Sequence, residues 1–138
     1  MRPNNWPNLL SDYIESSEAK SFEWGSHDCV HFAAGWLRVL GYQDPLAPFA
    51  SWSTALSAYR EIKRHGGFGL AVASRMAALG CHVTPPSRAQ RGDIALCQVD
   101  YRRQALGIVC GQHVAAPGVN RGVILVPLLP AAICTWHA

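Results

Sequence analysis

The sequence lacks a C-x-x-C pair, an apolar run long enough to cross a membrane and a long stripe of basic residues. Its five cysteines are odd in number and widely spaced, so neither a disulfide framework nor a zinc knuckle is supported: Cys29, Cys81, Cys97, Cys110 and Cys134. The longest apolar run, Val123 to Ile133, is interrupted by Pro127 and Pro130 and is shorter than the roughly 20 residues of a spanning helix. No membrane span is expected.

Charge is also scarce. Only 15% of the residues are charged and 49% are hydrophobic, which excludes a disordered chain and suggests a surface partly covered by neighbouring molecules. The net charge is +3 with scattered basic residues, so no nucleic acid partner is expected, and Arg102–Arg103 is interpreted as a polar hairpin tip. No signal-peptide pattern follows the first residues, so the chain is expected in the cytosol unless a larger particle carries it out.

The length of 138 residues predicts one domain, residues 1–138. Helical periodicity and stop signals predict four helices: Leu9 to Ser17, a second reaching Leu40, Ser51 to Arg64 with Ala55, Leu56, Tyr59 and Ile62 facing inward, and about Leu70 to Leu79. Short β-type runs follow Pro85–Pro86: Ile94 to Val99, Ala105 to Cys110, His113 to Ala116, Val123 to Val126 and Ile133 to Trp136. This order predicts an α+β fold with N-terminal helices packed on a C-terminal antiparallel sheet.

The stretch from Phe22 to Phe32 predicts a cysteine in the first turn of a helix. Ser26 or Asp28 can cap the helix, which places Cys29 where unpaired backbone N–H groups and the helix dipole favour an anion. A thiol in this position can ionise below its usual pKa, so Cys29 is the candidate nucleophile. Cys97, Cys110 and Cys134 lie inside apolar, strand-like segments, where a free cysteine usually acts as a small hydrophobe.

Two histidines flank Cys29 in the sequence. His27 and His31 are four residues apart, as in helical zinc sites, but no third ligand is evident, so neither a metal nor a cofactor is expected. His31 follows Cys29 by about 200° around the helix and should point away from the thiol. His27 lies at or before the helix start, and is a candidate catalytic residue or a loop histidine.

Several short motifs, in order, resemble the NlpC/P60 superfamily of papain-like cysteine peptidases that cut bacterial cell-wall peptides. The helix start Asp28–Cys29 and the strand entry Gly92–Asp93 match the family pattern. The chain is more closely similar to a compact group of phage and prophage tail proteins. Their motifs correspond here to Trp24-Gly25-Ser26-His27-Asp28-Cys29, Gly107-Ile108-Val109, Val114-Ala115-Ala116-Pro117-Gly118, and Val126-Pro127-Leu128 with Trp136.

The resemblance implies a papain-like centre in which a strand histidine activates Cys29. Aligned on Gly107–Ile108, that position holds Ala105, which cannot accept a proton, and the orienting polar residue would fall near Ala115 or Ala116. His113 is predicted opposite Cys110 across a tight turn, roughly 16 Å along the strand from Ala105. The candidate base is then His27 or another residue that the sequence does not identify.

Trp24 and Asp28 are candidate substrate-binding residues beside Cys29. Their structural alternatives are core packing for Trp24, together with Phe22 and Trp36, and helix capping for Asp28. Asp93 is expected to fix the turn before its strand.

Three functions follow from these features. The resemblance and the missing histidine favour a tail-associated structural protein that has lost catalysis. Its partners would be other phage tail proteins, and it would occupy the host cytoplasm during assembly and then the virion. The alternatives are an active cysteine peptidase or amidase that cuts peptidoglycan stem peptides, with Cys29 as nucleophile, and a module that binds such a peptide or a partner without cutting it.

Overall fold

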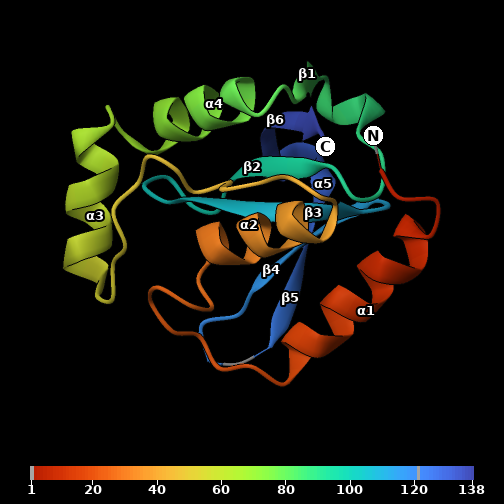
Figure 1. The fold of residues 1–138 in the computed structure, drawn as a ribbon, viewed down its shortest axis with the longest axis horizontal. Coiled ribbons are helices and arrows are strands. Elements are labelled where there is room, and N and C mark those ends of the chain that lie inside the picture. Colours follow the sequence, from red (N-terminus) through yellow and green to blue (C-terminus); the bar gives the residue numbers. More distant parts are fainter. Residues whose placement is uncertain (1, 121) are drawn as a thin grey trace.

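The computed structural model describes residues 2–120 and 122–138 and surrounds a six-stranded sheet with helices (Figure 1). Every pair of neighbouring strands is antiparallel, in the order β1-β6-β2-β3-β4-β5. The main helices precede the long strands in the sequence. The predicted α+β class, with N-terminal helices and an antiparallel sheet, is therefore confirmed.

The helices form near the predicted positions, with shifted starts. They are α1 (Trp6–Glu18), α2 (Cys29–Val39), α3 (Ala55–Arg64), α4 (Phe68–Ala78), the 3-10 turn η1 (Pro86–Arg88) and the short α5 (Leu128–Ala131). The predicted start of α3 at Ser51 is wrong. Thr54 caps the helix, because its hydroxyl accepts the Ser57 N–H while the Ser57 hydroxyl accepts the Thr54 N–H.

Five of the strands form at the predicted β-type runs, with ends that differ by one residue at most. They are β1 (His82–Thr84), β2 (Ile94–Gln98), β3 (Gln104–Cys110), β4 (His113–Pro117), β5 (Val123–Pro127) and β6 (Ala132–His137). Cys110 pairs with His113 across a turn in which Gly111 has a φ of +73°, so the predicted hairpin is confirmed. The sequence reading missed β1, whose three residues are too few to show a periodicity.

The core lies mainly between α2 and one face of the sheet. Phe32 and Trp36 of α2 are buried in one cluster with Leu106 and Ile108 of β3. The other face forms a smaller cluster around Val109, which α5 covers with Leu128. The alternation of side chains along β3 therefore divides the strand between two apolar layers.

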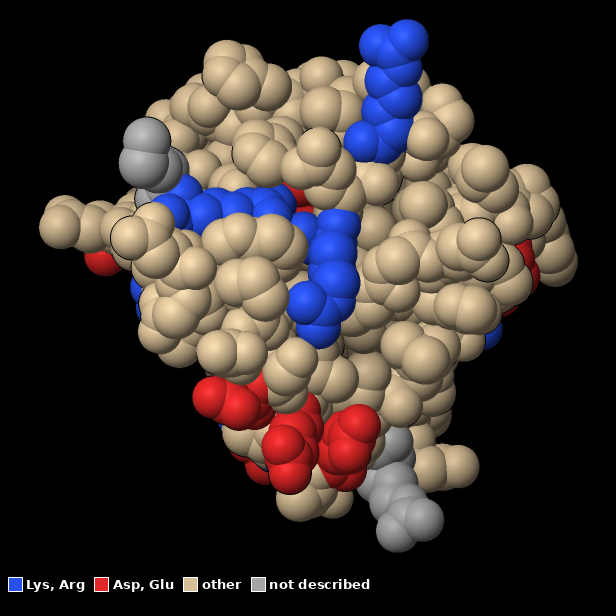
Figure 2. Space-filling view, turned by 90° about the vertical axis from the view of Figure 1, so that its right-hand side faces the viewer, with Lys and Arg blue, Asp and Glu red and all other residues tan. Residues whose placement is uncertain are grey.

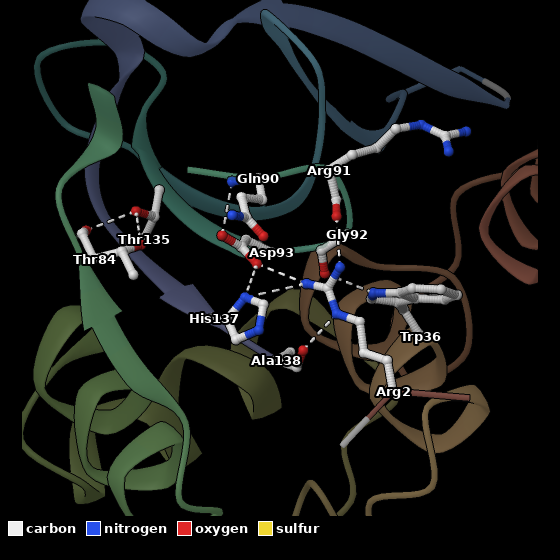
Figure 3. A network of polar contacts seen from close by, with 10 residues as sticks. All are labelled: Arg2, Trp36, Thr84, Gln90, Arg91, Gly92, Asp93, Thr135, His137 and Ala138. Carbon is white, nitrogen blue, oxygen red and sulfur yellow. Dashed lines mark hydrogen bonds and ion pairs between the residues drawn. The ribbon is translucent and has the colours of Figure 1, made fainter. Parts of the chain in front are cut away.

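A polar cluster joins the two ends of the described chain at one end of the sheet, beside the start of β2 and the end of β6 (Figure 3). The Arg2 guanidinium lies 2.7 Å from the Asp93 carboxylate and also donates to the Ala138 carbonyl at 2.6 Å. Asp93 also accepts the Gln90 N–H at 2.8 Å and contacts His137 at 2.9 Å. Asp93 fixes the turn before β2, as predicted, while its contacts with Arg2 and His137 are long-range features that no local pattern indicated.

The surface is poor in charge. Figure 2 views the side of α1 and the chain ends, where uncharged residues dominate and acidic side chains gather at one end. Large apolar side chains are exposed elsewhere, among them Ile124 and Leu125 on the edge strand β5. None of the helices in the described part of the chain is long and apolar enough to cross a membrane.

We expect the replacement Arg2→Met to lower the free energy of unfolding by about 2–3 kcal/mol, because Asp93 would keep a buried charge with fewer partners. The side chains of Arg2 and Asp93 are only 9% and 1% exposed. Urea unfolding followed by tryptophan fluorescence measures the change. The control is Arg60→Met on the exposed surface of α3, expected within about 0.5 kcal/mol of the parent. Equal stability of both variants would contradict a stabilising ion pair.

Candidate functional site

Cys29 is the first residue of α2, as the sequence predicted, and Asp28 is the N-cap. The Asp28 carboxylate accepts the His31 N–H at 2.8 Å, which satisfies one of the unpaired donors of the first helical turn. The predicted capping by Asp28 is therefore confirmed. The cap fixes the backbone on which Cys29 is held.

The Asp28 carboxylate also joins three separate segments. It accepts the Gly25 N–H at 2.9 Å and the Trp52 indole N–H at 2.8 Å, and lies 2.8 Å from the His31 ring nitrogen Nδ1. Burial alone would raise the pKa of Asp28, but these hydrogen bonds outweigh it and lower the pKa to about 2. Asp28 is therefore an ionised, fully engaged anchor, and its oxygens are already occupied by the protein itself.

The Trp24–Gly25 sequence has a local structural reason. Gly25 has a φ of +90°, and a side chain there would collide with the Trp52 backbone carbonyl. The close approach lets the Gly25 N–H and the Trp52 indole reach the same carboxylate oxygen. Trp24 itself stays partly exposed, stacked edge-to-face on Phe22 with ring centroids 5.0 Å apart.

The Cys29 thiol is held in its neutral form. Burial raises its pKa to about 11, and the adjacent Asp28 carboxylate raises it further, while backbone hydrogen bonds from Leu106, Cys29 and Val30 oppose the change. The helix N-terminus does not produce the lowered pKa that the sequence position suggested. At neutral pH the thiolate population is therefore very small.

Cys29 lies in an open cleft of about 690 Å³. One wall is α3, which presents Ala58, Tyr59, Ile62 and Lys63 at helical spacing, and the opposite side is the turn between β2 and β3. Trp24 lines the same cleft, so the structure brings three of the predicted site residues together: Trp24, Asp28 and Cys29. Figure 1 shows α3 standing apart from the sheet at the side of the molecule opposite α1.

The predicted inward face of α3 needs a correction. Leu56 and Tyr59 are 57% and 63% exposed, whereas Ala58 is buried. The helix contacts α4 and borders the cleft instead of packing flat on the sheet, so its amphipathic pattern faces a cleft and not a core. Helical periodicity alone does not distinguish the two environments.

His27 is not among the residues that line the cleft. Its ring is buried, with Nε2 3.3 Å from the Gly122 carbonyl and the ring edge-to-face with Phe32. These contacts direct the ring toward the loop between β4 and β5, and no hydrogen bond with Cys29 occurs in the described part of the chain. His31 contacts Asp28 and stacks on Trp52, away from the thiol as its helical angle predicted.

Ala105, the strand position aligned with the family histidine, does not supply a base either. Ala105 pairs with Cys97 on β2, and Cys97 belongs to the cluster on the far face of the sheet. Gln104, one residue earlier, lines the cleft instead, and its amide is bonded to Gln98 at 3.3 Å. Neither Ala105 nor Gln104 can accept a proton from Cys29.

The sequence reading missed several cleft residues. Trp52 lies 23 positions after Cys29, in a loop with no periodic signal. The basic residues of the cleft, Lys63, Arg102 and Arg103, come from separate elements, so only the fold brings them together.

The described residues contain no group of three or more metal-ligating side chains.

Replacement of Asp28 by asparagine should destabilise the protein at neutral pH and shift its acid sensitivity. The pKa of Asp28 falls from 3.8 to about 2 on folding, so ionisation contributes about 2 kcal/mol that is present above pH 4 and is lost as the pH falls through about 2. The stability gap between parent and Asp28→Asn should therefore narrow as urea titrations move from about pH 5 to about pH 2.

The matched control is Asp12→Asn, which removes an exposed carboxylate on α1. It should leave stability within about 0.5 kcal/mol of the parent. A gap between parent and Asp28→Asn that is independent of pH would show that the Asp28 charge makes no net contribution.

Comparison with known proteins identifies a family for this arrangement. No curated protein matches the sequence. A family model described as a domain of unknown function (DUF6950) matches residues 1–138, a range that includes the Cys29 helix and both walls of the cleft. The chain therefore belongs to the DUF6950 family.

Proposed function

We propose that this protein is a tail-associated structural component of a phage or prophage, with an NlpC/P60-like fold that no longer catalyses peptide hydrolysis. The observation that carries the proposal is that, within the described residues, no histidine ring is hydrogen-bonded to the Cys29 thiol, because the rings of His27 and His31 contact Gly122 and Asp28 instead. A helix-borne cysteine beside an antiparallel sheet, and the order of short motifs in the sequence, support the fold relationship. The absent base supports the loss of catalysis.

Cysteine peptidase chemistry requires a thiolate and an acid for the leaving amine. A papain-like imidazole lowers the thiol pKa and returns the proton to the amine. Here burial raises the pKa of Cys29 to about 11, and the ring of His27 is engaged with Gly122 and Phe32. Within residues 2–120 and 122–138, neither the thiolate nor the leaving amine therefore has a group that would support this chemistry.

A structural role among other tail proteins accounts for the surface. The edge strand β5 carries exposed Ile124 and Leu125, and Leu129 and Ile133 are exposed in the following segment. Apolar residues on a free strand edge favour contacts with other chains. In this proposal the protein is assembled in the host cytoplasm and then resides in the virion tail.

The alternative function is an active peptidase or amidase acting on peptidoglycan stem peptides. One observation favours it: Cys29 and Trp24 line a cleft large enough for a peptide segment. In that function Cys29 would be the nucleophile, and His27 would have to turn from Gly122 to serve as base.

The reaction rate of Cys29 with iodoacetamide, measured against pH by mass spectrometry, tests the proposal. We expect negligible reaction near neutral pH and an apparent pKa near the value of about 11 that burial imposes. The urea-unfolded protein supplies the reference, with all thiols titrating near 8.5. Buried Cys97, whose pKa is also raised to about 11 by burial, is the internal control.

A midpoint near or below neutral pH, with a rate far above that of Cys97, would overturn the non-catalytic proposal. It would establish an activated thiolate despite Ala105. Replacement of Cys29 by serine should leave folding intact in either case, since serine retains the size of the side chain.

A further inference from the structure

We propose that the cleft beside Cys29 binds an extended, acidic segment of a partner protein. This inference names the chemistry of a partner for the non-catalytic function proposed above, and it rests on that proposed function. Three features of the cleft support the proposal. They are its positively charged side chains, its exposed aromatic rings and the hydrogen-bonded turn on one side.

The charges that line the cleft are nearly all positive. Lys63 comes from α3, while Arg102 and Arg103 come from the β2–β3 turn on the other side. Asp28 is the one acidic residue in the lining, and its carboxylate is already bonded by the Gly25 and His31 N–H groups and the Trp52 indole. A cleft with one sign of charge concentrates field lines and attracts the opposite sign.

Two of these cations have no carboxylate partner within residues 2–120 and 122–138. Lys63 lies 6.0 Å from the centroid of the Tyr59 ring, and the guanidinium of Arg102 lies 5.1 Å from that of Tyr101. Arg103, by contrast, is paired with Asp100 at 2.7 Å. Each wall of the cleft thus presents one unpaired cation beside a tyrosine ring.

The turn that carries Arg102 is held in place by its own hydrogen bonds. The Asp100 carboxylate accepts the backbone N–H groups of Arg102 and Arg103 at 2.9 and 3.0 Å. The Val99 N–H donates to the Arg103 carbonyl at 2.8 Å, which closes the base of the turn. A preformed turn reduces the ordering cost of binding a ligand.

Exposed aromatic rings supply the apolar part of the surface. Tyr59 is 63% exposed and Tyr101 is 85% exposed, and Trp24 also lines the cleft. Tyrosine and tryptophan are enriched where proteins bind peptides, because they offer large contact area with few rotatable bonds. Cations paired with such rings favour a ligand that alternates carboxylates with apolar groups.

A peptide fits these features better than a nucleic acid. Binding a phosphate backbone relies on a track of cations that follows successive nucleotides. The cleft has two unpaired cations, one on each wall, and the net charge of the chain is only +3. An extended segment with two or three carboxylates matches the small number of unpaired cations and their placement on both walls of the cleft.

The alternative occupant of the cleft is a second copy of this chain (Figure 2). Acidic side chains gather at one end of the face that Figure 2 shows, which lies away from α3, and α1 exposes Asp12, Glu15 and Glu18. A second copy of this chain could therefore offer α1 to the cleft in a head-to-tail contact. A helix does not offer the extended backbone that an open cleft between two walls accommodates, so we favour a partner segment.

Fluorescence anisotropy with a fluorescein-labelled peptide of alternating glutamate and alanine tests the proposal on the full chain at low ionic strength. We expect saturable binding that weakens with added salt, and little binding of the glutamine–alanine or lysine–alanine peptides. Lys63→Glu and Arg102→Glu should each weaken binding at least about tenfold, because each places a carboxylate beside the ligand.

The matched control is Arg60→Glu, which makes the same charge change on the same helix outside the cleft lining. It should alter binding by less than about twofold. Circular dichroism before each titration confirms that the exposed substitutions leave the fold unchanged. If Arg60→Glu and Lys63→Glu weaken peptide binding equally, the loss of affinity reflects the net charge of the protein and not the cleft, and the proposal is overturned.

Three further outcomes overturn it. No binding of the glutamate peptide by the folded parent is the first. Tighter binding of a fluorescein-labelled oligothymidine than of the peptide would identify a nucleic acid site. Self-association in light scattering that Lys63→Glu abolishes, without peptide binding, would identify a second copy as the occupant.

The assay distinguishes this proposal from the loss of catalysis on which it builds. Peptide binding is measured by anisotropy without modifying the thiol, so the binding result and the thiol reactivity are independent readouts. An activated thiol together with peptide binding would remove the non-catalytic function and leave the acidic ligand in place. An inert thiol without peptide binding would leave the non-catalytic function in place and overturn the acidic ligand.

Discussion

The buried Asp28 carboxylate is the interaction on which the site depends. Its two oxygens hold the first turn of α2, the glycine turn at Gly25 and the indole of Trp52. An ionised carboxylate in a buried position is stable only if hydrogen bonds replace the lost water, and here they replace it well enough to lower its pKa. The position of α2, and with it Cys29, follows from this network.

Burial opposes the effect of the helix start on the Cys29 thiol. A helix terminus stabilises an anion by about 0.3–1 kcal/mol. Burial, with a contribution from the neighbouring Asp28 charge, raises the pKa of Cys29 from 9.0 to about 11, a cost to the thiolate of about 3 kcal/mol. The effect of burial is larger than that of the helix terminus, so the pKa of Cys29 is raised. A papain-like site would need a cation beside the sulfur, and the two histidines that flank Cys29 in the sequence, His27 and His31, contact Gly122 and Asp28 instead.

How much the sequence could predict depended on the range of the interactions. Helix capping by Asp28 and the hairpin between Cys110 and His113 are local, and both were predicted correctly. The contacts of Asp93 with Arg2 and His137 link the ends of the chain, and nothing in a local pattern indicates them. The candidate site followed the same rule: Cys29 was recognised at its helix start, whereas Lys63 and Arg102 enter the cleft only through folding.

The exposed position of α3 connects the fold to the cleft. Tyr59 and Lys63 can line a wall because the helix leans on α4 and leaves part of its amphipathic face unburied. The segment before α3 is tied to α2 through Trp52 and Asp28. A ligand that moves α3 must therefore bend the residues between Trp52 and Ala55, which also loosens the hydrogen bond from the Ala50 N–H to Glu61 of α3, or strain the Asp28 network. Because a buried carboxylate that loses a donor is costly, the short connection should flex first, and the Cys29 helix should keep its place while α3 adjusts to the bound segment.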